Sequence, residues 1–406
     1  MILESYAGIA PKRDLIIIRL LGRRFAGRTF LHVNSTRVGG GVAEILHRML
    51  PILNDIGIRA RWEVIEGDPD FFDMTKKIHN ALQGKPEEIT SSMWEHHFQV
   101  NRINAEGMDL GADFAFIHDP QPVPLIDFRP SGAKWVWRCH IDLSTPHEAA
   151  AERIQAYALK YEAAIFSVAK FARGMPVPEY VVLPSIDPLS EKNRELEKEE
   201  IEEIANKFNI PPGKPLILQV SRFDRFKDPL GVIKAWRMVR KYNDCMLVLA
   251  GSPATDDPEG PKILAEVEEF AAGDPDIKVL LLPAFSDREI NALQRLATVV
   301  LQKSVKEGFG LTVSEAMWKG KPVIGGAVGG IPYQIIHGQN GFLVHSVEGA
   351  AFRIRQFLNS PDLLKSMGEK AREHVRNNFL ITRQIRDYLS VWAAVEEPES
   401  TSIMMV

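Results

Sequence analysis

Short apolar runs alternate regularly with amphipathic stretches along this chain. Runs rich in β-branched residues, such as RTFLHVNST (28–36) and CMLVLAGS (245–252), are typical of buried strands. Helical patterns such as VAEILHRMLPILNDIG follow them. Because a crossover between parallel strands usually contains a helix, this alternation predicts parallel sheets. The sequence therefore indicates an α/β fold with doubly wound sheets.

The same alternation divides the chain into two parts. It pauses over a charged, proline-flanked stretch at 184–215, which we interpret as a linker region, and then restarts. A chain of 406 residues is also too long for one ordinary domain. We therefore predict one domain at 1–190, a second at 191–380, and a C-terminal helix and tail at 381–406. The expected strands are 28–36, 58–65, 113–119, 133–140, 163–168, 180–184, 215–221, 245–252, 277–283, 298–304 and 321–326.

Charge and composition argue against several classes of partner. The net charge of −4 disfavours nucleic-acid binding by bulk electrostatics, so no nucleic-acid partner is expected. The first apolar run, Leu15 to Leu21, is short and interrupted by Arg19, so no membrane partner is expected. Cys139 and Cys245 lie inside apolar runs and are interpreted as reduced core residues, which favours a cytoplasmic location.

A glycine-rich loop, TRVGGGVAEIL, follows the first expected strand. In doubly wound sheets, ligands bind beyond the carboxyl ends of the strands. Glycines at a helix N-terminus let a phosphate approach the backbone N–H groups, so Gly40 and Gly41 are candidate phosphate ligands. A dinucleotide fingerprint would need a glycine where Glu44 stands, and no Walker Gly-Lys-Ser/Thr follows. A tight turn without a ligand is the alternative.

A second candidate loop, QVSRFDRFKDP, follows the strand at 215–221. A guanidinium and an ammonium in one loop suit a pyrophosphate, so Arg222 and Lys227 are candidate phosphate ligands. The alternative is a solvated basic loop in which Asp224 and Asp228 pair with these cations.

The segment KEGFGLTVSEAM holds two glutamates, Glu307 and Glu315, on either side of a glycine-rich stretch. The glycines disfavour a helix through Glu307, so we expect this residue in a loop. Glu315 is expected in the first turns of a helix that Leu311 and Thr312 open. Their N–H groups could bind phosphate oxygens, and a carboxylate can accept hydrogen bonds from the vicinal diol of a ribose or a hexose.

Together these motifs resemble a known family. EGFGLTVSEAM is similar to the signature of retaining nucleotide-sugar glycosyltransferases with the GT-B fold, SRFDRFKDP to their donor-phosphate loop, and GGGVAE to their N-terminal glycine loop. The resemblance covers nearly the whole chain. It implies two Rossmann-like domains that face each other across a cleft. The first would bind the acceptor and the second the nucleotide sugar, and the C-terminal helix would cross back to the first domain.

The resemblance also implies roles for single residues. His140, which follows the strand KWVWRC, resembles the family's histidine near the reacting centre. The residues implied in catalysis are Glu307, His140, Arg222 and Lys227. Those implied in binding the donor nucleotide and its phosphates are Gly40, Gly41, Arg222, Lys227, Leu311, Thr312 and Glu315, the last through the ribose. Those implied in binding the donor sugar are Glu307, Gly308, Phe309 and Gly310.

A narrower resemblance points to trehalose-forming members of the family. Four segments are similar to synthases that join NDP-glucose to glucose and to the related phosphorylases, and their sequences resemble the synthases more. These segments are VNSTRVGGGVAEIL, GDPDFFDMTKKIHNALQG, HDPQP and WRCHIDLS. The expected small-molecule partners are therefore an NDP-glucose such as UDP- or ADP-glucose, glucose and trehalose. Weaker acceptor candidates are Asp119, Gln121 and His79.

The sequence is also compatible with three other functions. A phosphorylase would use inorganic phosphate in place of a nucleotide, and another glucosyltransferase would use a different acceptor. A non-catalytic nucleotide-sugar sensor could use the same scaffold. The sequence does not specify the base or the oligomeric state, and a homodimer is one option.

No cofactor and no metal ion are expected to be required. Metal-dependent transferases of another fold use an Asp-x-Asp motif, which Asp68-Pro69-Asp70 and Asp274-Pro275-Asp276 match in wording. Each match contains a proline and is typical of a turn or a helix start. The leaving diphosphate would instead be stabilised by Arg222, Lys227 and the helix N-terminus at Leu311.

Overall fold

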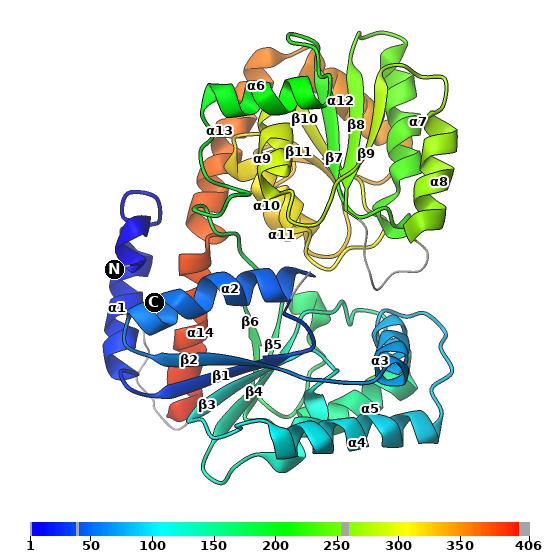
Figure 1. Ribbon diagram of the computed structural model, residues 1–406. Helices are drawn as coiled ribbons and strands as arrows, with labels where there is room; N and C mark the ends of the chain where they lie inside the picture. The colour runs from blue at the N-terminus through cyan, green and yellow to red at the C-terminus, as the bar shows by residue number, and fades with distance from the viewer. Residues whose placement is uncertain (1, 38–39, 253–259, 398–406) are drawn as a thin grey trace. The chain divides into compact units, whose positions relative to one another are not determined.

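The structure, a computed structural model, describes residues 2–37, 40–252 and 260–397. The chain divides into two compact units, one formed by the residues up to Ser185 together with those from Ile381 on, the other by Ile186–Leu380. Each unit contains a six-stranded parallel sheet with helices packed around it (Figure 1). The predicted α/β class with two doubly wound units is confirmed. The division lies slightly before the predicted boundary after residue 190.

The first unit has the strand order β2-β1-β3-β4-β5-β6. The chain builds the sheet outward from β1 to β2 and then from β3 to β6, so the order reverses between β1 and β3. Its strands are β1 (Thr29–Asn34), β2 (Arg59–Val64), β3 (Phe114–His118), β4 (Lys134–Cys139), β5 (Ala163–Phe166) and β6 (Glu179–Val181). Its helices are η1 (Leu3–Tyr6), α1 (Lys12–Arg24), α2 (Gly40–Asp55), α3 (Pro69–Leu82), α4 (Ser91–Gly107), η2 (Val123–Phe128), α5 (Glu148–Ala158), η3 (Ala169–Phe171) and α14 (Ile381–Glu396).

Aromatic side chains hold α14 against the first sheet, although α14 is the last helix of the chain. Tyr388 stacks on Phe116 of β3 with ring centroids 4.7 Å apart. Trp392 packs against Phe114 at 4.6 Å and against Phe30 of β1 at 5.8 Å. Large rings of this kind supply much of the apolar area that a core buries. The C-terminal helix is therefore an integral part of the first unit.

The second unit has the strand order β12-β11-β10-β7-β8-β9, which reverses between β7 and β10. Its strands are β7 (Leu216–Val220), β8 (Met246–Gly251), β9 (Ile277–Leu281), β10 (Val299–Gln302), β11 (Val323–Gly326) and β12 (Gly341–Val344). Its helices are α6 (Lys198–Lys207), η4 (Arg225–Lys227), α7 (Pro229–Arg240), α8 (Gly260–Ala271), α9 (Asp287–Leu296), α10 (Leu311–Trp318), α11 (Ile331–Gln334), α12 (Val347–Leu358) and α13 (Pro361–Asn378). The core joins Trp236 of α7 and Ile354 of α12 to the central strands.

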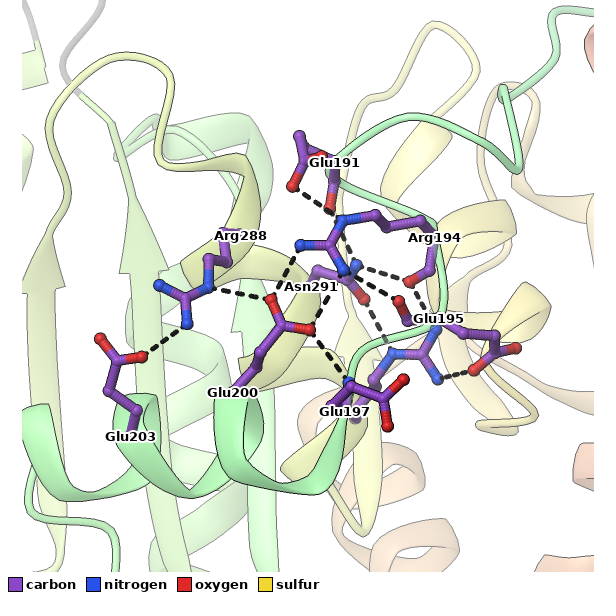
Figure 2. A network of polar contacts seen from close by, with 9 residues as sticks. Glu191, Arg194, Glu195, Glu197, Glu200, Glu203, Arg288 and Asn291 are labelled. Carbon is purple, nitrogen blue, oxygen red and sulfur yellow. Dashed lines mark hydrogen bonds and ion pairs between the residues drawn. The ribbon is translucent and has the colours of Figure 1, made fainter.

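The chain passes from the first unit to the second at Ser185–Ile186, inside the stretch interpreted as a linker region. The charged segment that follows is anchored in the second unit. Asn291 of α9 is fully buried, and its side-chain amide donates to the carbonyl oxygens of Glu191 (2.8 Å) and Arg194 (2.9 Å). The Arg194 guanidinium donates in turn to both carboxylate oxygens of Glu200 on α6, at 2.8 and 3.1 Å (Figure 2). The high charge of this segment therefore reflects a polar anchor to α6 and α9, and not a solvated connection.

Candidate functional site

The sheet of the second unit brings Lys227 and Glu307 together. The strand order reverses between β7 and β10, and such a reversal is where doubly wound sheets open a ligand crevice at their carboxyl ends. Lys227 ends the turn η4 after β7, and Glu307 lies in the loop after β10. The Lys227 Nζ lies 2.7 Å from Oε1 and 2.7 Å from Oε2 of Glu307. The sequence assigned these residues to different parts of a donor, whereas the structure pairs them directly.

Further donors surround the Glu307 carboxylate. The Ser304 hydroxyl donates to Oε2 at 3.0 Å, and the Gln302 side-chain amide approaches the same oxygen at 3.4 Å. The residue is only 8% exposed. A carboxylate that is buried to this degree needs such compensation, because burial of an unpaired charge costs several kcal/mol. Glu307 is therefore held in one orientation as a hydrogen-bond acceptor.

The glycines around Glu307 shape its loop. Gly310 has φ +80°, in the left-handed region, and caps α10. The Gly330 N–H donates to the Gly308 carbonyl at 2.8 Å. A Cβ added at Gly329 would lie 1.7 Å from the Glu307 carbonyl oxygen, so no side chain fits there. The second glycine-rich stretch, GGAVGG at 325–330, thus packs against the loop, and sequence reasoning missed this signal although the glycines are plain in the sequence.

Helix α10 begins at Leu311, with Thr312 and Glu315 in its first turns, as the glycines predicted. Glu315 is 3% exposed and is therefore more deeply buried than Glu307 in the preceding loop. Its Oε1 lies 4.0 Å from the Lys192 Nζ, and its Oε2 lies 3.4 Å from the Gln294 Nε2. The carboxylate thus sits in a buried polar cluster at the start of the helix.

A buried lysine, which the sequence did not single out, lies beside Glu315. The Lys319 ammonium donates to the Asn193 side-chain oxygen at 3.0 Å and to the Glu315 carbonyl at 3.2 Å. Desolvation lowers the pKa of Lys319 to about 7, with the charge of Glu315 acting in the opposite direction. The sequence could have indicated this contact, because Lys319 follows Glu315 by four residues and residues four apart lie on one face of a helix.

Arg222 occupies the same loop as Lys227 but stands apart from the Lys227–Glu307 pair. Its side chain is 46% exposed, and its guanidinium lies 3.8 Å from the Asp224 carboxylate. Asp224 itself accepts a hydrogen bond from the Phe226 N–H at 2.7 Å, and this bond shapes the turn η4. Asp228, the other expected partner in this loop, caps α7 and binds Lys303. Arg222 is therefore a loosely held cation beside the strand end.

In the first unit, Asp119 and His140 lie beyond the carboxyl ends of β3 and β4. Asp119 has φ +66°, an unusual conformation for a residue other than glycine. Its Oδ1 accepts a hydrogen bond from the His140 backbone N–H at 2.7 Å. Burial raises the pKa of the Asp119 carboxyl to about 6, although the His140 N–H opposes that shift. The strained residue is thus held with its carboxylate next to the histidine.

The His140 side chain ends a row of imidazoles that sequence reasoning missed. His118 Nδ1 lies 3.0 Å from His140 Nε2, and His118 Nε2 lies 3.1 Å from His32 Nδ1. His32 belongs to β1 and His118 to β3. Only the order and the register of the strands bring these three histidines together, and neither is legible in a single sequence.

The remaining first-unit candidates lie in different settings. The Gln121 carbonyl accepts from His97 and Asn101 of α4, at 2.9 and 3.0 Å, and so ties its loop to that helix. His79 lies half-buried on the last turn of α3, on a helix and not at a strand end. Gly40 and Gly41 form the first turn of α2, while Gly39 lies outside the described residues.

The two Asp-x-Asp matches lie at a helix start and at a turn, as predicted. Asp68 caps α3 by accepting a hydrogen bond from the Phe71 N–H at 2.7 Å. Asp274 binds Arg237, and Asp276 binds Lys214, next to the turn before β9.

Within the described residues, the structure holds no group of three or more His, Cys, Asp or Glu that could bind a metal ion. Likewise, none of the described helices is long and apolar enough to cross a membrane.

Comparison with known proteins places both units in one family. Residues 32–173 match the family model "Trehalose synthase, N-terminal domain", and residues 200–374 match "Glycosyl transferases group 1". A trehalose synthase of Pyrococcus horikoshii is 46% identical over 96% of this chain and 95% of that protein. A trehalose phosphorylase of Pleurotus pulmonarius is more distant, at 29% identity over 84% of this chain and 54% of that protein.

Solved structures agree on the fold. A glycosyltransferase of Rickettsia africae superposes with a TM-score of 0.71 at 20% identity, covering 92% of this chain and 99% of that one. Likeness at this level of identity concerns the fold alone. The full-length match to the synthase is what carries the assignment. The chain belongs to the trehalose synthase family of glycosyltransferases, with the GT-B fold.

Proposed function

We propose that the chain transfers glucose from an NDP-glucose to a second glucose, with retention of configuration, and so forms trehalose. The observation that carries the donor half is the pairing of Lys227 with Glu307 where the second sheet reverses its order. The observation that carries the product is the near-full-length match to a trehalose synthase. The nucleotide base is left open in this proposal.

The second unit supplies groups for each part of the donor. A lysine ammonium has three N–H donors, and Lys227 directs two of them to Glu307, which leaves one for a phosphate oxygen. Arg222 and the Leu311 and Thr312 N–H groups at the start of α10 would bind the remaining diphosphate oxygens. Glu315 would accept hydrogen bonds from the ribose hydroxyls, and Glu307 from a hydroxyl of glucose. These roles require no metal ion.

The proposed reaction exchanges one glycosidic bond for another. The bond between the donor C1 and the phosphate oxygen breaks, and the acceptor hydroxyl oxygen forms the new bond on the same face of the sugar. The proton of that hydroxyl passes to the leaving phosphate, so atoms and charge balance without a further reactant. Lys227 and Arg222 would stabilise the negative charge that gathers on the diphosphate in the transition state. This is the main catalytic contribution that we assign to the second unit.

The first unit would bind the acceptor. The Asp119 carboxylate is held by its hydrogen bond from the His140 N–H, and a fixed carboxylate can orient a glucose hydroxyl. Gln121 would line the same loop. We assign His79 no contact, because it lies on the last turn of α3.

A product assay tests this proposal. The protein is incubated with glucose and UDP-, ADP- or GDP-glucose in separate reactions, and with trehalose plus inorganic phosphate in a fourth. We expect a non-reducing disaccharide in at least one nucleotide reaction and no reaction in the phosphate arm. Breakdown of trehalose only with phosphate would identify a phosphorylase. Binding of a nucleotide sugar without any turnover would identify a sensor.

A further inference from the structure

The three histidines of the first unit form a continuous hydrogen-bonded row. Their N···N contacts are 3.1 Å between His32 and His118 and 3.0 Å between His118 and His140. Neighbouring rings are nearly parallel, with interplanar angles of 24° and 19°. His32 and His118 are buried, whereas His140 is half-buried at the carboxyl end of β4. The row therefore leads from the core to the candidate acceptor residues.

Burial favours the neutral form of all three rings. Burial lowers the pKa of His32 to about 3 and holds the pKa of His118 and of His140 well below the usual range. The nearby charge of the buried Arg138 acts in the same direction on His118 and His140. A neutral imidazole has one N–H donor and one acceptor nitrogen. His118 must then donate in one contact and accept in the other, so the row can run in only two directions.

The inner end of the row distinguishes the two directions. The His32 Nε2 is enclosed and has no hydrogen-bond partner within the described part of the chain. If the row pointed inward, this atom would carry an N–H with no acceptor. If the row points outward, the atom carries only a lone pair. Buried N–H groups without a partner are rare, and leaving one unsatisfied costs about 1–3 kcal/mol. The outward direction is therefore favoured.

We propose that His32 and His118 are positioning residues that hold His140 in its Nδ1–H tautomer. His32 Nδ1–H donates to His118 Nε2, and His118 Nδ1–H donates to His140 Nε2. The Nε2 lone pair of His140 is thereby occupied, and its proton is placed on Nδ1. No described residue forms a hydrogen bond with that Nδ1.

The tautomer decides what His140 can do. A neutral Nδ1–H donates a hydrogen bond to an oxygen such as a sugar hydroxyl, and it cannot accept the acceptor's proton. His140 is then a fixed donor and not a general base, which agrees with transfer of that proton to the leaving phosphate. The identity of the sugar ligand rests on the proposed function, whereas the tautomer rests on the row alone.

Two variants of His118 separate the tautomer from packing. In His118→Asn, the side-chain amide occupies the position of Nδ1 and can donate to His140 Nε2. His118→Leu has the same shape as asparagine but no donor. We expect kcat/KM of the leucine variant to fall roughly tenfold or more below that of the asparagine variant, which corresponds to one hydrogen bond. If His118 served only to fill space, leucine would be tolerated at least as well in this buried position. That result would overturn the proposal.

A spectroscopic measurement on the unmodified protein is independent of activity and of variant folding. The protein is labelled with ¹⁵N-histidine, and long-range ¹H–¹⁵N correlations report which ring nitrogen carries the proton. We expect Nδ1–H for His32, His118 and His140. If this pattern is found in a protein that forms no trehalose, the proposed function fails and the tautomer inference stands. An Nε2–H signal for His140 in an active protein would overturn the inference and leave the function intact.

Discussion

The Lys227 ammonium lies 2.7 Å from each carboxylate oxygen of Glu307. The two residues come from loops that follow different strands, β7 and β10, and the reversal of strand order places those strands side by side. A cation proposed for the phosphate and a carboxylate proposed for the sugar are thus one electrostatic unit. Changes to either residue must affect the other.

A double-mutant cycle tests this coupling. Lys227→Ala leaves a largely buried carboxylate without its cation, so we expect it to lower the free energy of unfolding of the second unit by about 3 kcal/mol. Adding Glu307→Ala should recover part of that loss, because the unpaired charge is removed. Urea unfolding of the two single variants and the double variant measures the coupling. Arg225 and Glu266 form an exposed control pair at 2.9 Å, for which we expect a coupling below about 1 kcal/mol. Additive losses at Lys227 and Glu307 would contradict the pairing.

The two glutamates should differ in what they bind. Glu307→Gln keeps the size of the side chain but weakens its hydrogen bond to a glucose hydroxyl. We therefore expect the rate of glucosyl transfer to fall at least tenfold, while the affinity for the nucleoside diphosphate changes less. Glu315→Gln should show the reverse, with weaker nucleotide binding through the ribose. Calorimetry with the diphosphate and initial rates with the sugar nucleotide provide the two readouts. Equal effects of both variants on both readouts would contradict the division of roles.

Arg222 and Arg225 offer a matched comparison within one loop. Arg222 is loosely held near Asp224, whereas Arg225 is bound to Glu266 and is 57% exposed. We expect Arg222→Ala to weaken donor binding roughly tenfold or more, as for a charge-assisted hydrogen bond of about 1.5–3 kcal/mol. Arg225→Ala should leave the Kd within about twofold. Donor affinity that is unchanged in Arg222→Ala would remove this residue from the phosphate site.

The sequence predicted the alternation of strands and helices well, because buried parallel strands and amphipathic helices have distinct periods. It also placed the start of α10 correctly, because glycine disfavours a helix through Glu307. It missed α1, whose apolar run was considered only as a membrane candidate, and it missed β12. Buried Leu15, Ile18 and Leu21 show a helical spacing in retrospect.

The contacts of the site were the least predictable part. The Lys227–Glu307 pair depends on β10 returning to the side of β7, and the histidine row depends on the register between β1, β3 and β4. A single sequence shows which residues end each strand but not which strands are neighbours. The packing of the segment after Ser185 was unpredictable for a related reason. Composition shows that the segment after Ser185 is charged, but not that Asn291 and Glu200 hold it in place.

The buried histidines predict that acid weakens the first unit. Burial lowers the pKa of His32 to about 3 and of His97 to about 4, from 6.5 in the unfolded chain. Between those limits the unfolded state binds more protons, so stability falls as pH falls below 6.5. From pH 6.5 to 5, each histidine contributes a loss of about 1.6 kcal/mol.

Asp119 acts in the opposite direction, because the pKa of its carboxyl is raised to about 6 and the folded state therefore gains stability as pH falls through that value. Chemical unfolding of the wild type and of Asp119→Asn at pH 7 and pH 5 measures both effects. We expect a lower stability at pH 5 in both proteins and a steeper fall in the variant. Equal stability at the two pH values would contradict the neutral histidines.

Transfer of glucose to glucose is tested most directly by following an isotope from acceptor to product. Uniformly ¹³C-labelled glucose is incubated with unlabelled NDP-glucose and the protein, and the disaccharide is analysed by NMR and mass spectrometry. We expect an α,α-1,1-linked disaccharide in which one glucose unit is labelled and the other is not. Absence of this product with every nucleotide tested, or its appearance only from glucose 1-phosphate, would contradict the account.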